Sequence, residues 1–500
     1  MLALGAALPA VWWEPLHLDE RVMLELSPHN PVTIVREVFV DRGGAPLQFL
    51  VEHVTLSWPG GLAGLRLPSL VFFLLALAFM GPVGRGLMGS REGWTATLLL
   101  ALAPLAVGLA TFARMYALLL WLVLAAAWLS LRAGRSGMRR DWCAAGALAG
   151  ALVYAHPIAP LYALPAFACG IAVSELSVRA AIAHARAGVV TGVAVALPYL
   201  YALAVLRARY DVGEVQPLST TAGRTVPEEA LHALTPEGVV GLILFTALAT
   251  AGAVRLLRSR PRVGMLLALW VVVPIAFFTA VPADTRFFGR YVLPALPAFL
   301  LLVATGCMSV GRRPQVAVAL VALLLALEGL EDANRLRTLS RLELTGLPSP
   351  ARGEVLFSST GSPRSDRPPE LLDDLVALES PGVSRVEELP AIDPRFDPDV
   401  VAKGVRSVRS FLAGGGSAMG VWLFRGTERR ADAAAARLAR DPELNARRVG
   451  RELLVVSSRQ VVSRRRLVEL AERARVAWGT TTPRDRWPRT IAGIDRAALG

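Results

Sequence analysis

The sequence predicts an all-α polytopic membrane protein with about eleven transmembrane helices, followed by a small C-terminal α/β domain. Of its 500 residues, 54% are hydrophobic, and the mean hydropathy is +0.48, which is too apolar for a soluble chain of this length. The apolar residues gather in runs long enough to cross a bilayer. After these runs the composition becomes rich in Arg, Asp, Glu and Pro. We therefore expect a transmembrane domain over residues 1–334 and a second domain over residues 335–500.

The charge and the cysteines exclude several classes of function. The net charge is +13 and comes almost entirely from arginine, because Lys403 is the only lysine. Basic loops of an integral membrane protein meet anionic lipid first, so we expect membrane lipid and no nucleic acid as a partner. Cys143, Cys169 and Cys307 all fall in apolar runs, without the spacing of a metal site or a disulfide framework. They are typical of small buried hydrophobic residues.

The first apolar run, Leu2–Trp13, is short and is followed by an acidic pair. As a helix it would rise only about 18 Å, against a hydrocarbon core of about 30 Å. It lacks a basic leading region and makes a poor signal peptide, so we expect a truncated first span. Asp19 and Glu20 come next, and carboxylates beside a membrane-embedded run are costly to place. They are our first functional candidates, with a solvated helix cap as the alternative.

Residues 14–61 are predicted to form a long outer loop, which Pro and Gly residues divide into pieces. Within it, Pro46–Trp58 carries apolar residues at helical spacing, with Glu52 and His53 between them. This composition favours a helix that lies in the membrane interface. The alternatives are a solvated Glu52 and a packing or capping role for His53.

The remaining apolar runs alternate with arginine-rich loops, which assigns the sides of the membrane. By the positive-inside rule the arginine-rich face is cytoplasmic. The opposite face then holds the acidic pair and a long loop at 207–236, which we expect to be a mobile flap ordered by substrate. An odd number of spans places the C-terminal domain on this extracytoplasmic face of a bacterial inner membrane, in the cell envelope. The expected spans are residues 63–83, 92–110, 115–131, 142–155, 158–174, 186–206, 237–255, 263–281, 291–309 and 314–330.

The C-terminal region alternates short apolar stretches with amphipathic ones. Residues 354–359, 420–424 and 452–457 are predicted strands, and residues 431–440 and 462–478 are predicted helices. This alternation indicates a small α/β domain.

Few ionisable residues fall on the predicted outer face, and most of them lie in three turns. A carboxylate on this face would activate a hydroxyl or amide nucleophile, and guanidinium groups would hold a phosphate. The alternatives without a catalytic role are arginines that snorkel to the membrane interface and a histidine that only stabilises its turn. The candidates are Arg114 and Tyr116 in TFARMY, His156 in YAHP, and Arg286, Arg290 and Tyr291 in TRFFGRY.

These motifs occur in an order that resembles a known family. The acidic pair is followed by PLQFLVEHVTLSWPGGLAGLRLPSL, then by GSREGWTATLLLALAPLAVGLATFARMYALLL, and then by RFFGRYVLPALPAFLLL. This succession, over about residues 14–310, is similar to the polytopic membrane glycosyltransferases of the GT-C superfamily. The nearest branch is the bacterial relatives of protein O-mannosyltransferases and aminoarabinose transferases. No single motif is specific, so the resemblance depends on their order and topological placement.

The resemblance implies a GT-C fold, an activity and a role for each candidate. Asp19 would be the general base, and Glu20 would orient the acceptor or tune Asp19. Arg114, Arg286 and Arg290 would bind the phosphate of a polyprenyl-phosphate sugar donor, with hydrogen bonds from Tyr116, Tyr291 and His156. A hexose or pentose would pass with inversion to an extracytoplasmic glycan, lipid or protein acceptor.

The chain also departs from the family pattern. The outer turn at Arg114 lacks the second acidic residue that some members have, so the sequence does not support a divalent metal, and we assign no cofactor. Three other functions remain as alternatives: a transporter or flippase of lipid-linked sugars, a surface-polysaccharide polymerase or ligase, and a membrane scaffold. A transporter is expected to carry mid-membrane charges and matched broken spans, whereas the charges here lie at the outer rim.

Overall fold

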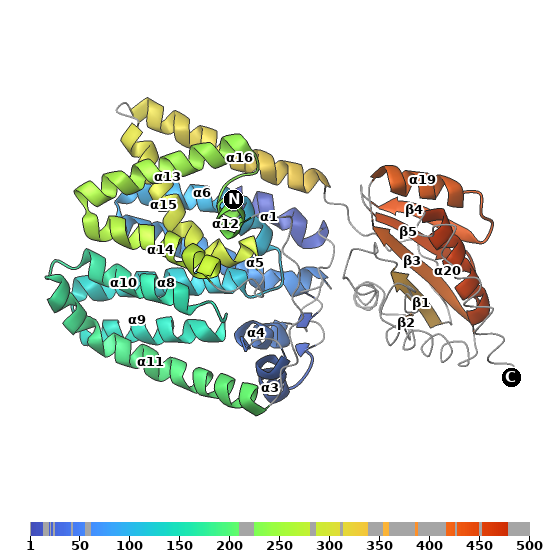
Figure 1. The fold of residues 1–500 in the computed structure, drawn as a ribbon, viewed down its shortest axis with the longest axis horizontal. Coiled ribbons are helices and arrows are strands. Elements are labelled where there is room, and N and C mark those ends of the chain that lie inside the picture. The colour runs from blue at the N-terminus through green and yellow to red at the C-terminus, as the bar shows by residue number, and fades with distance from the viewer. Residues whose placement is uncertain are drawn as a thin grey trace. The chain divides into compact units, whose positions relative to one another are not determined.

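A computed structural model shows a helical membrane unit and a smaller α/β unit (Figure 1). The first comprises Met1–Trp12 and Val22–Arg337, and the second comprises Trp13–Arg21 and Thr338–Gly500. The structure describes residues 2–13, 20, 22–23, 26–41, 44–55, 62–209, 225–280, 287–310, 314–338, 354–359, 386–388, 417–425, 428–449 and 453–478.

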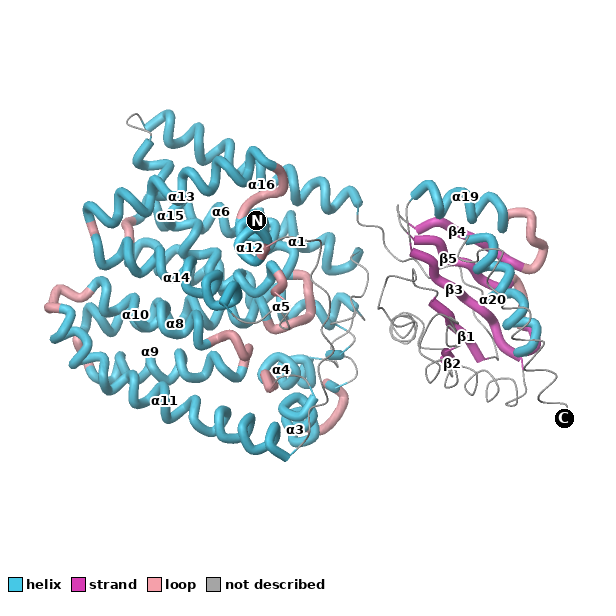
Figure 2. Tube along the Cα trace, in the orientation of Figure 1, coloured by secondary structure: helices cyan, strands magenta, loops and turns pink. Residues whose placement is uncertain are grey.

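The helices of the first unit run side by side, with short connections at both ends (Figures 1 and 2). Their order along the chain confirms the predicted helical character of this region. The helices are α1 (Leu2–Trp13), α3 (Pro31–Asp41), α4 (Leu47–Thr55), α5 (Leu62–Leu87), α6 (Ser90–Leu102), α7 (Pro104–Ala110), α8 (Tyr116–Ser136), α9 (Arg139–Ala151), η1 (Leu152–Tyr154), α10 (Pro160–Val173), α11 (Val178–Arg209), α12 (Val226–Leu234), α13 (Val239–Ser259), α14 (Pro261–Ala280), η2 (Gly289–Ala295), α15 (Leu296–Val310) and α16 (Pro314–Thr338).

Six helices in the described part of the chain are long and apolar enough to cross a membrane, and the bent pair α6–α7 makes a seventh if it is one span. The six are α5, α8, α11, α13, α14 and the joined η2–α15. Three other expected spans are shorter than a membrane crossing requires. Helices α1, α9 and α10 contain 12, 13 and 14 residues, so they rise about 18 to 21 Å. The protein is thus a multi-pass membrane protein with fewer full-length spans among its described residues than the sequence predicted.

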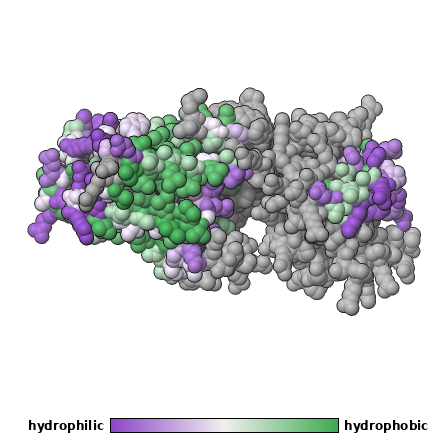
Figure 3. All heavy atoms as spheres, turned by 90° about the horizontal axis from the view of Figure 1, so that it is seen from above, coloured by the Kyte–Doolittle hydropathy of each residue, from purple (hydrophilic) through white to green (hydrophobic). Residues whose placement is uncertain are grey.

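The helices approach closely where glycines face each other. On α9, a Cβ added at Gly146 would lie 1.9 Å from the carbonyl oxygen of Gly188 on α11, and one at Gly150 would lie 2.2 Å from that of Gly192. Only glycine allows this contact, which is how membrane helices pack without a hydrophobic driving force. The outer face of α11 is apolar and exposed, and hydrophobic residues cover the middle of this unit (Figure 3).

The arginine-rich loops gather at one end of the helices, on the left of Figure 1, as the sequence predicts. Hydrogen bonds tie these loops together. Arg135 donates to the carbonyl of Gly86, Arg260 donates to the carbonyl of Met88, and Arg262 donates to the carbonyl of Ser174. The turns that carry the candidate site lie at the opposite ends of the same helices.

The second unit contains a mixed sheet with the strand order β2-β1-β3-β5-β4, in which β6 also pairs with β3. β1 is parallel to β2 and β3, whereas β5 is antiparallel to β3 and β4. Two helices pack against each other and against β3 and β4. The elements are β1 (Glu354–Ser359), β2 (Val386–Glu388), β3 (Ser417–Arg425), α19 (Glu428–Leu438), β4 (Leu444–Val449), β5 (Leu453–Ser458), β6 (Val462–Ser463) and α20 (Arg464–Trp478).

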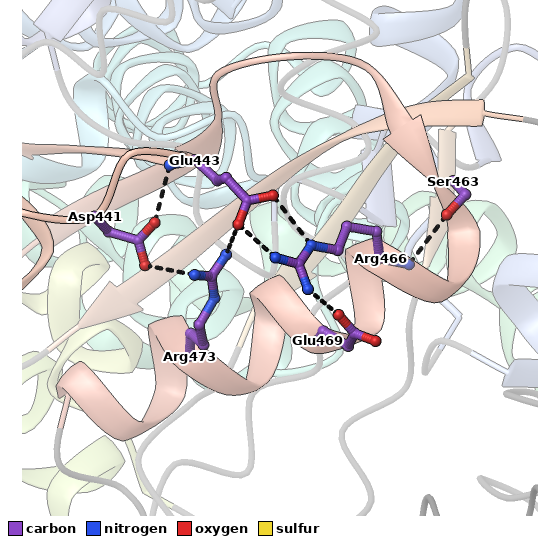
Figure 4. Close-up of polar contacts among 6 residues, drawn as sticks. All are labelled: Asp441, Glu443, Ser463, Arg466, Glu469 and Arg473. Atoms are coloured by element: carbon purple, nitrogen blue, oxygen red, sulfur yellow. Dashed lines mark hydrogen bonds and ion pairs between the residues drawn. The ribbon is translucent and has the colours of Figure 1, made fainter.

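An ion-pair network ties α20 to the turn before β4 (Figure 4). Glu443 accepts hydrogen bonds from Arg466 (Nε to Oε1, 3.0 Å) and from Arg473 (Nη2 to Oε2, 2.6 Å). Asp441 pairs with the other end of Arg473 at 3.1 Å. The hydrogen bonds from Arg466 and Arg473 lower the pKa of the Glu443 carboxyl to about 2. The three strands and two helices expected in this region are present, whereas β2, β4 and β6 were not predicted.

Candidate functional site

A broken helix presents the first of the candidate turns. Pro104 starts α7, and the preceding Ala103 is extended (φ −60°, ψ 119°), so α6 and α7 meet at a 58° bend. Proline forces this break because it lacks an N–H and disfavours helical geometry in the residue before it. α7 then ends at Ala110, the short turn carries Arg114, and Tyr116 begins α8.

His156 lies in the second turn, between η1 and α10, and is buried. The backbone N–H of Ile158 donates to its Nδ1 at 3.1 Å, so Nε2 carries the proton of the neutral imidazole. Burial first, and then the positive charges of Arg114 and Arg290, lower the pKa of His156 to about 3. The ring is therefore neutral at physiological pH and presents a hydrogen-bond donor.

Arg290 belongs to the third turn and is held among aromatic rings. Its guanidinium carbon lies 4.4 Å from the ring centroid of Phe288, 5.4 Å from that of Tyr116 and 6.0 Å from that of Phe112. Cation–π attraction at such distances stabilises the charge in a partly desolvated place. Phe112 and Tyr116 belong to the first turn and Phe288 belongs to the third, so this arginine joins the two turns.

Tyr291 completes the cluster, because its ring packs against those of Tyr116 and His156. Its ring centroid lies 6.5 Å from that of Tyr116 and 5.8 Å from that of His156. The 3₁₀ helix η2 that carries it is fixed from below, because the hydroxyl of Tyr162 donates to the Tyr291 carbonyl and the indole N–H of Trp270 donates to the Pro294 carbonyl. The structure thus brings three turns, far apart in sequence, to one place.

Helix α4 borders the cluster through Phe49, whose ring centroid lies 5.8 Å from the guanidinium of Arg114. The same face buries Glu52, whose carboxylate accepts hydrogen bonds from Gln48 (2.7 Å) and from Thr55 (3.3 Å). The alternative that Glu52 is a solvated residue on the outer face of the helix is therefore wrong. Its local partners satisfy the buried carboxylate, so the polar side of α4 faces inward.

His53 lies one residue further along and is half-buried. Its Nδ1 lies 2.8 Å from the carbonyl oxygen of Ser27, which fits the packing role that was left open for it. α4 itself forms where the sequence predicted an interfacial helix, over Leu47–Thr55.

Of the candidates, Arg114, Tyr116, His156, Arg290 and Tyr291 come together in one cluster. Asp19 and Arg286 lie outside the described residues. Glu20 is described and is fully buried. Within the described ranges, no group of three or more His, Cys, Asp or Glu side chains is placed to hold a metal ion.

The outer loop at 207–236 differs from its prediction in one part. Residues 226–234 form α12, which begins with a capping box between Thr225 and Glu228 and packs against η2. This section is a packed helix beside the site. Residues 210–224 lie outside the described part of the chain.

Several aromatic residues of the site were missed from the sequence. Phe49, Phe112 and Phe288 surround the two arginines, and Tyr162 supports η2. A signal existed for two of them, because Phe112 and Phe288 stand two residues before Arg114 and Arg290. Nothing local in the sequence singled out Phe49 or Tyr162.

The arrangement favours an anionic ligand. The charges of two guanidinium groups act on one neutral imidazole, and all three groups can donate hydrogen bonds to a ligand. Charge-assisted hydrogen bonds from arginine to phosphate are short and strong, and the planar fork of arginine fits phosphate oxygens. Aromatic walls exclude water and strengthen such contacts.

Comparison with solved structures shows that the chain is similar in fold to a bacterial membrane protein, ArnT. ArnT from Cupriavidus metallidurans in the apo state is 17% identical, the match covers 91% of this chain and 97% of ArnT, and the TM-score is 0.50. The structure of the same protein bound to undecaprenyl phosphate is also 17% identical; the match covers 91% of this chain and 97% of ArnT, and the TM-score is 0.49. The apo oligosaccharyltransferase of Archaeoglobus fulgidus gives 13% identity, 67% of this chain, 55% of that chain and a TM-score of 0.44.

No protein-family model and no curated protein matches the sequence. The chain is nevertheless similar in fold to ArnT over most of its length. This similarity bears out the resemblance that the motifs indicated at the level of the fold.

Proposed function

We propose that this protein is an integral membrane glycosyltransferase that moves a sugar from a polyprenyl-phosphate donor to an extracytoplasmic acceptor. The observation that carries the proposal is the convergence of Arg114 and Arg290 on a neutral His156 within an aromatic cluster. The fold shared with ArnT supports the same class of reaction. One structure of ArnT holds undecaprenyl phosphate, so we take a polyprenyl phosphate as the leaving group here.

In the proposed reaction the two arginines bind the donor phosphate. As the bond between the anomeric carbon and the phosphate oxygen breaks, negative charge develops on that oxygen, and the guanidinium groups stabilise it. The Nε2–H of His156 donates to the same phosphate. Polyprenyl phosphate is then released, which leaves the sugar on the acceptor.

Asp19 is proposed to take the proton of the acceptor hydroxyl or amide while the acceptor atom forms its bond to the anomeric carbon. A single displacement inverts the configuration at that carbon. Glu20 is proposed to orient the acceptor or to tune Asp19, because two adjacent carboxylates disfavour joint ionisation. Arg286 would add a third phosphate contact.

The finer topology belongs to the same proposal. About eleven spans, counting α1, α9, α10 and α16, would put the site and the 335–500 domain on the extracytoplasmic face of a bacterial inner membrane. The acceptor is an envelope glycan, lipid or protein.

The donor-site test is a binding measurement on the purified protein in lipid nanodiscs. We expect Arg114→Gln to bind undecaprenyl phosphate about tenfold or more weakly than wild type, because one charge-assisted contact is lost. Binding of undecaprenol, which lacks the phosphate, should not change. Arg258→Gln is the matched control, because Arg258 is an exposed arginine at the opposite end of the helices.

Catalysis is tested separately with Asp19→Asn. We expect this variant to bind undecaprenyl phosphate normally and to lose transfer from undecaprenyl-phosphate hexoses and pentoses to envelope acceptors. Transfer at the wild-type rate would show that Asp19 is not the base. Undecaprenyl phosphate and undecaprenol binding with equal affinity would argue against the donor site, and export of an intact lipid-linked sugar without transfer would favour a flippase.

A further inference from the structure

A second site lies at the arginine-rich end of the membrane unit, opposite the candidate active site. An open cavity of about 900 Å³ lies there between the ends of α5, α8, α10 and α14, with one wall from α11. Its charged lining consists of Arg135, Arg260, Arg262, His184 and Glu175. Nothing in the proposed transfer reaction uses these residues.

The three arginines of the cavity are held in place through one nitrogen each. Arg135 donates through Nη2 to the Gly86 carbonyl at 3.1 Å. Arg260 uses Nη1 for the last carbonyls of α5, and Arg262 uses Nη1 for the carbonyls of Ser174 and Leu176, at 3.1 and 3.0 Å. These bonds neutralise the negative ends of two helices. They also fix each guanidinium, so less side-chain entropy is lost when its remaining N–H groups bind a ligand.

The charge balance of the lining favours an anion. Three arginines face one carboxylate, that of Glu175. Asp141, a further acid at this end of the helices, is already engaged, because it accepts a hydrogen bond from Ser136 at 2.6 Å and pairs with Arg132 at 3.6 Å. A phosphate group offers more acceptor oxygens than a carboxylate does, so it can accept hydrogen bonds from several guanidinium groups at once.

The apolar part of the lining indicates where the phosphate comes from. Leu87, Val173 and Leu176 line the cavity together with the arginines. On α11, the helix that contributes His184 to the lining, Val178 and Ile182 begin an exposed apolar face that continues through the middle of the unit. A phospholipid fits both features, because its headgroup can enter the cavity while its acyl chains lie along α11. A soluble phosphate compound has no acyl chain that could cover the apolar surface.

We propose that this cavity binds the phosphate headgroup of an anionic phospholipid. Basic pockets between membrane helices recognise such lipids, and each arginine that contacts the bound headgroup is expected to add about fivefold in affinity. The bound headgroup would add a cross-link between the ends of helices that already pack against one another and are joined there by arginine–carbonyl bonds.

The test uses the full chain in nanodiscs of phosphatidylcholine with and without phosphatidylglycerol, with retained lipid read by native mass spectrometry. The triple variant R135Q/R260Q/R262Q should lose phosphatidylglycerol binding about a hundredfold. The charge-matched triple R179Q/R186Q/R258Q changes exposed arginines of α11 and α13 that do not line the cavity, and its phosphatidylglycerol binding should fall fivefold or less. Because the first triple also removes helix anchors, L176W provides a second variant, which fills the cavity and keeps every arginine.

The outcomes separate the sources of phosphate. Loss of lipid binding in both R135Q/R260Q/R262Q and L176W, but not in the control triple, supports the site. Equal losses in the two triples would show general surface attraction and overturn the proposal. Displacement of phosphatidylglycerol by millimolar glycerol phosphate or inorganic phosphate would assign the cavity to a soluble ligand and would overturn it as well. None of these readouts depends on glycosyl transfer.

Discussion

Replacing Arg290 by glutamine removes a positive charge that three aromatic rings surround at 4.4 to 6.0 Å. In the free protein the loss is modest, because cation–π contacts contribute about 0.5–1 kcal/mol each and glutamine still fills part of the space. With a bound polyprenyl phosphate the variant also loses a charge-assisted hydrogen bond, which is worth about 1.5–3 kcal/mol. We therefore expect undecaprenyl phosphate to bind about tenfold to a hundredfold more weakly.

A lysine at the same position separates charge from shape. Arg290→Lys keeps the charge but loses the planar fork and the stacking on the three rings. Its affinity for undecaprenyl phosphate should fall between those of wild type and Arg290→Gln. A point charge alone would instead restore wild-type binding.

The assay is equilibrium binding in nanodiscs at two salt concentrations, with thermal unfolding as the check on folding. The wild type should lose affinity as salt rises, and Arg290→Gln should lose less, because one charged contact is already gone. The reasoning is refuted if a folded Arg290→Gln protein binds undecaprenyl phosphate within twofold of wild type. It is equally refuted if undecaprenol binding falls by the same factor as undecaprenyl phosphate binding.

Three further predictions concern stability. The pKa of His156 is about 3 in the folded protein and near 6.5 in the unfolded chain, so the free energy of unfolding should fall by about 1.4 kcal/mol per pH unit as pH drops from 6.5 towards 3. His156→Gln should flatten this slope. If the melting temperatures of wild type and His156→Gln changed in parallel between pH 4 and 7, the prediction would be contradicted. Gly146→Ala puts a Cβ 1.9 Å from the Gly188 carbonyl oxygen and should cost about 1–3 kcal/mol or prevent folding, whereas Gly329→Ala, where nothing lies within 4 Å, should change the melting temperature little. Glu443 is half-buried and its pKa is lowered to about 2, so its pairing stabilises the α/β unit above pH 4.5 and this contribution is lost below about pH 2. Glu443→Gln should remove this acid dependence with only a small change in stability at pH 7, as circular dichroism of the full chain can show.

The site was partly predictable because its chemistry is concentrated in turns. Arg114, His156 and Arg290 each stand in a short connection between apolar runs, and the distribution of arginines placed these connections on one face. Positive-inside reasoning therefore located the cluster, although it gave no distances. The supporting aromatic residues escaped, because an isolated Phe49 looks like any apolar residue of an amphipathic helix.

Other elements escaped because their polar residues are satisfied locally. The inward face of α4 carries Gln48 and Glu52, which bond to each other, so hydrophobic periodicity pointed to the wrong side of the helix. Helix α12 carried a readable signal, the capping box that begins at Thr225, but the polar composition of the surrounding loop outweighed it. Strand β4 contains Arg447 and Arg448 at the edge of the sheet, where apolar alternation is weak.

The predicted number of spans exceeds the number of full-length apolar helices among the described residues for a geometric reason. Apolar composition marks a stretch as membrane-embedded, but helix length is decided by where prolines and turns interrupt it. Pro104 divides one long apolar run into α6 and α7, and Pro160 starts α10 late. A run that reads as one span in the sequence is then a bent pair or a helix of 14 residues in the structure.

The hydrogen bond from the Ile158 N–H to His156 has a kinetic consequence. It fixes the tautomer of the ring, and burial beside two arginines keeps the ring from taking a second proton above about pH 3. His156 is thus a donor of constant strength over the whole range in which a membrane enzyme is assayed. In a pH–rate profile of this protein, a limb at pH 5 to 7 must then report another group: the acceptor base, or the donor phosphate itself.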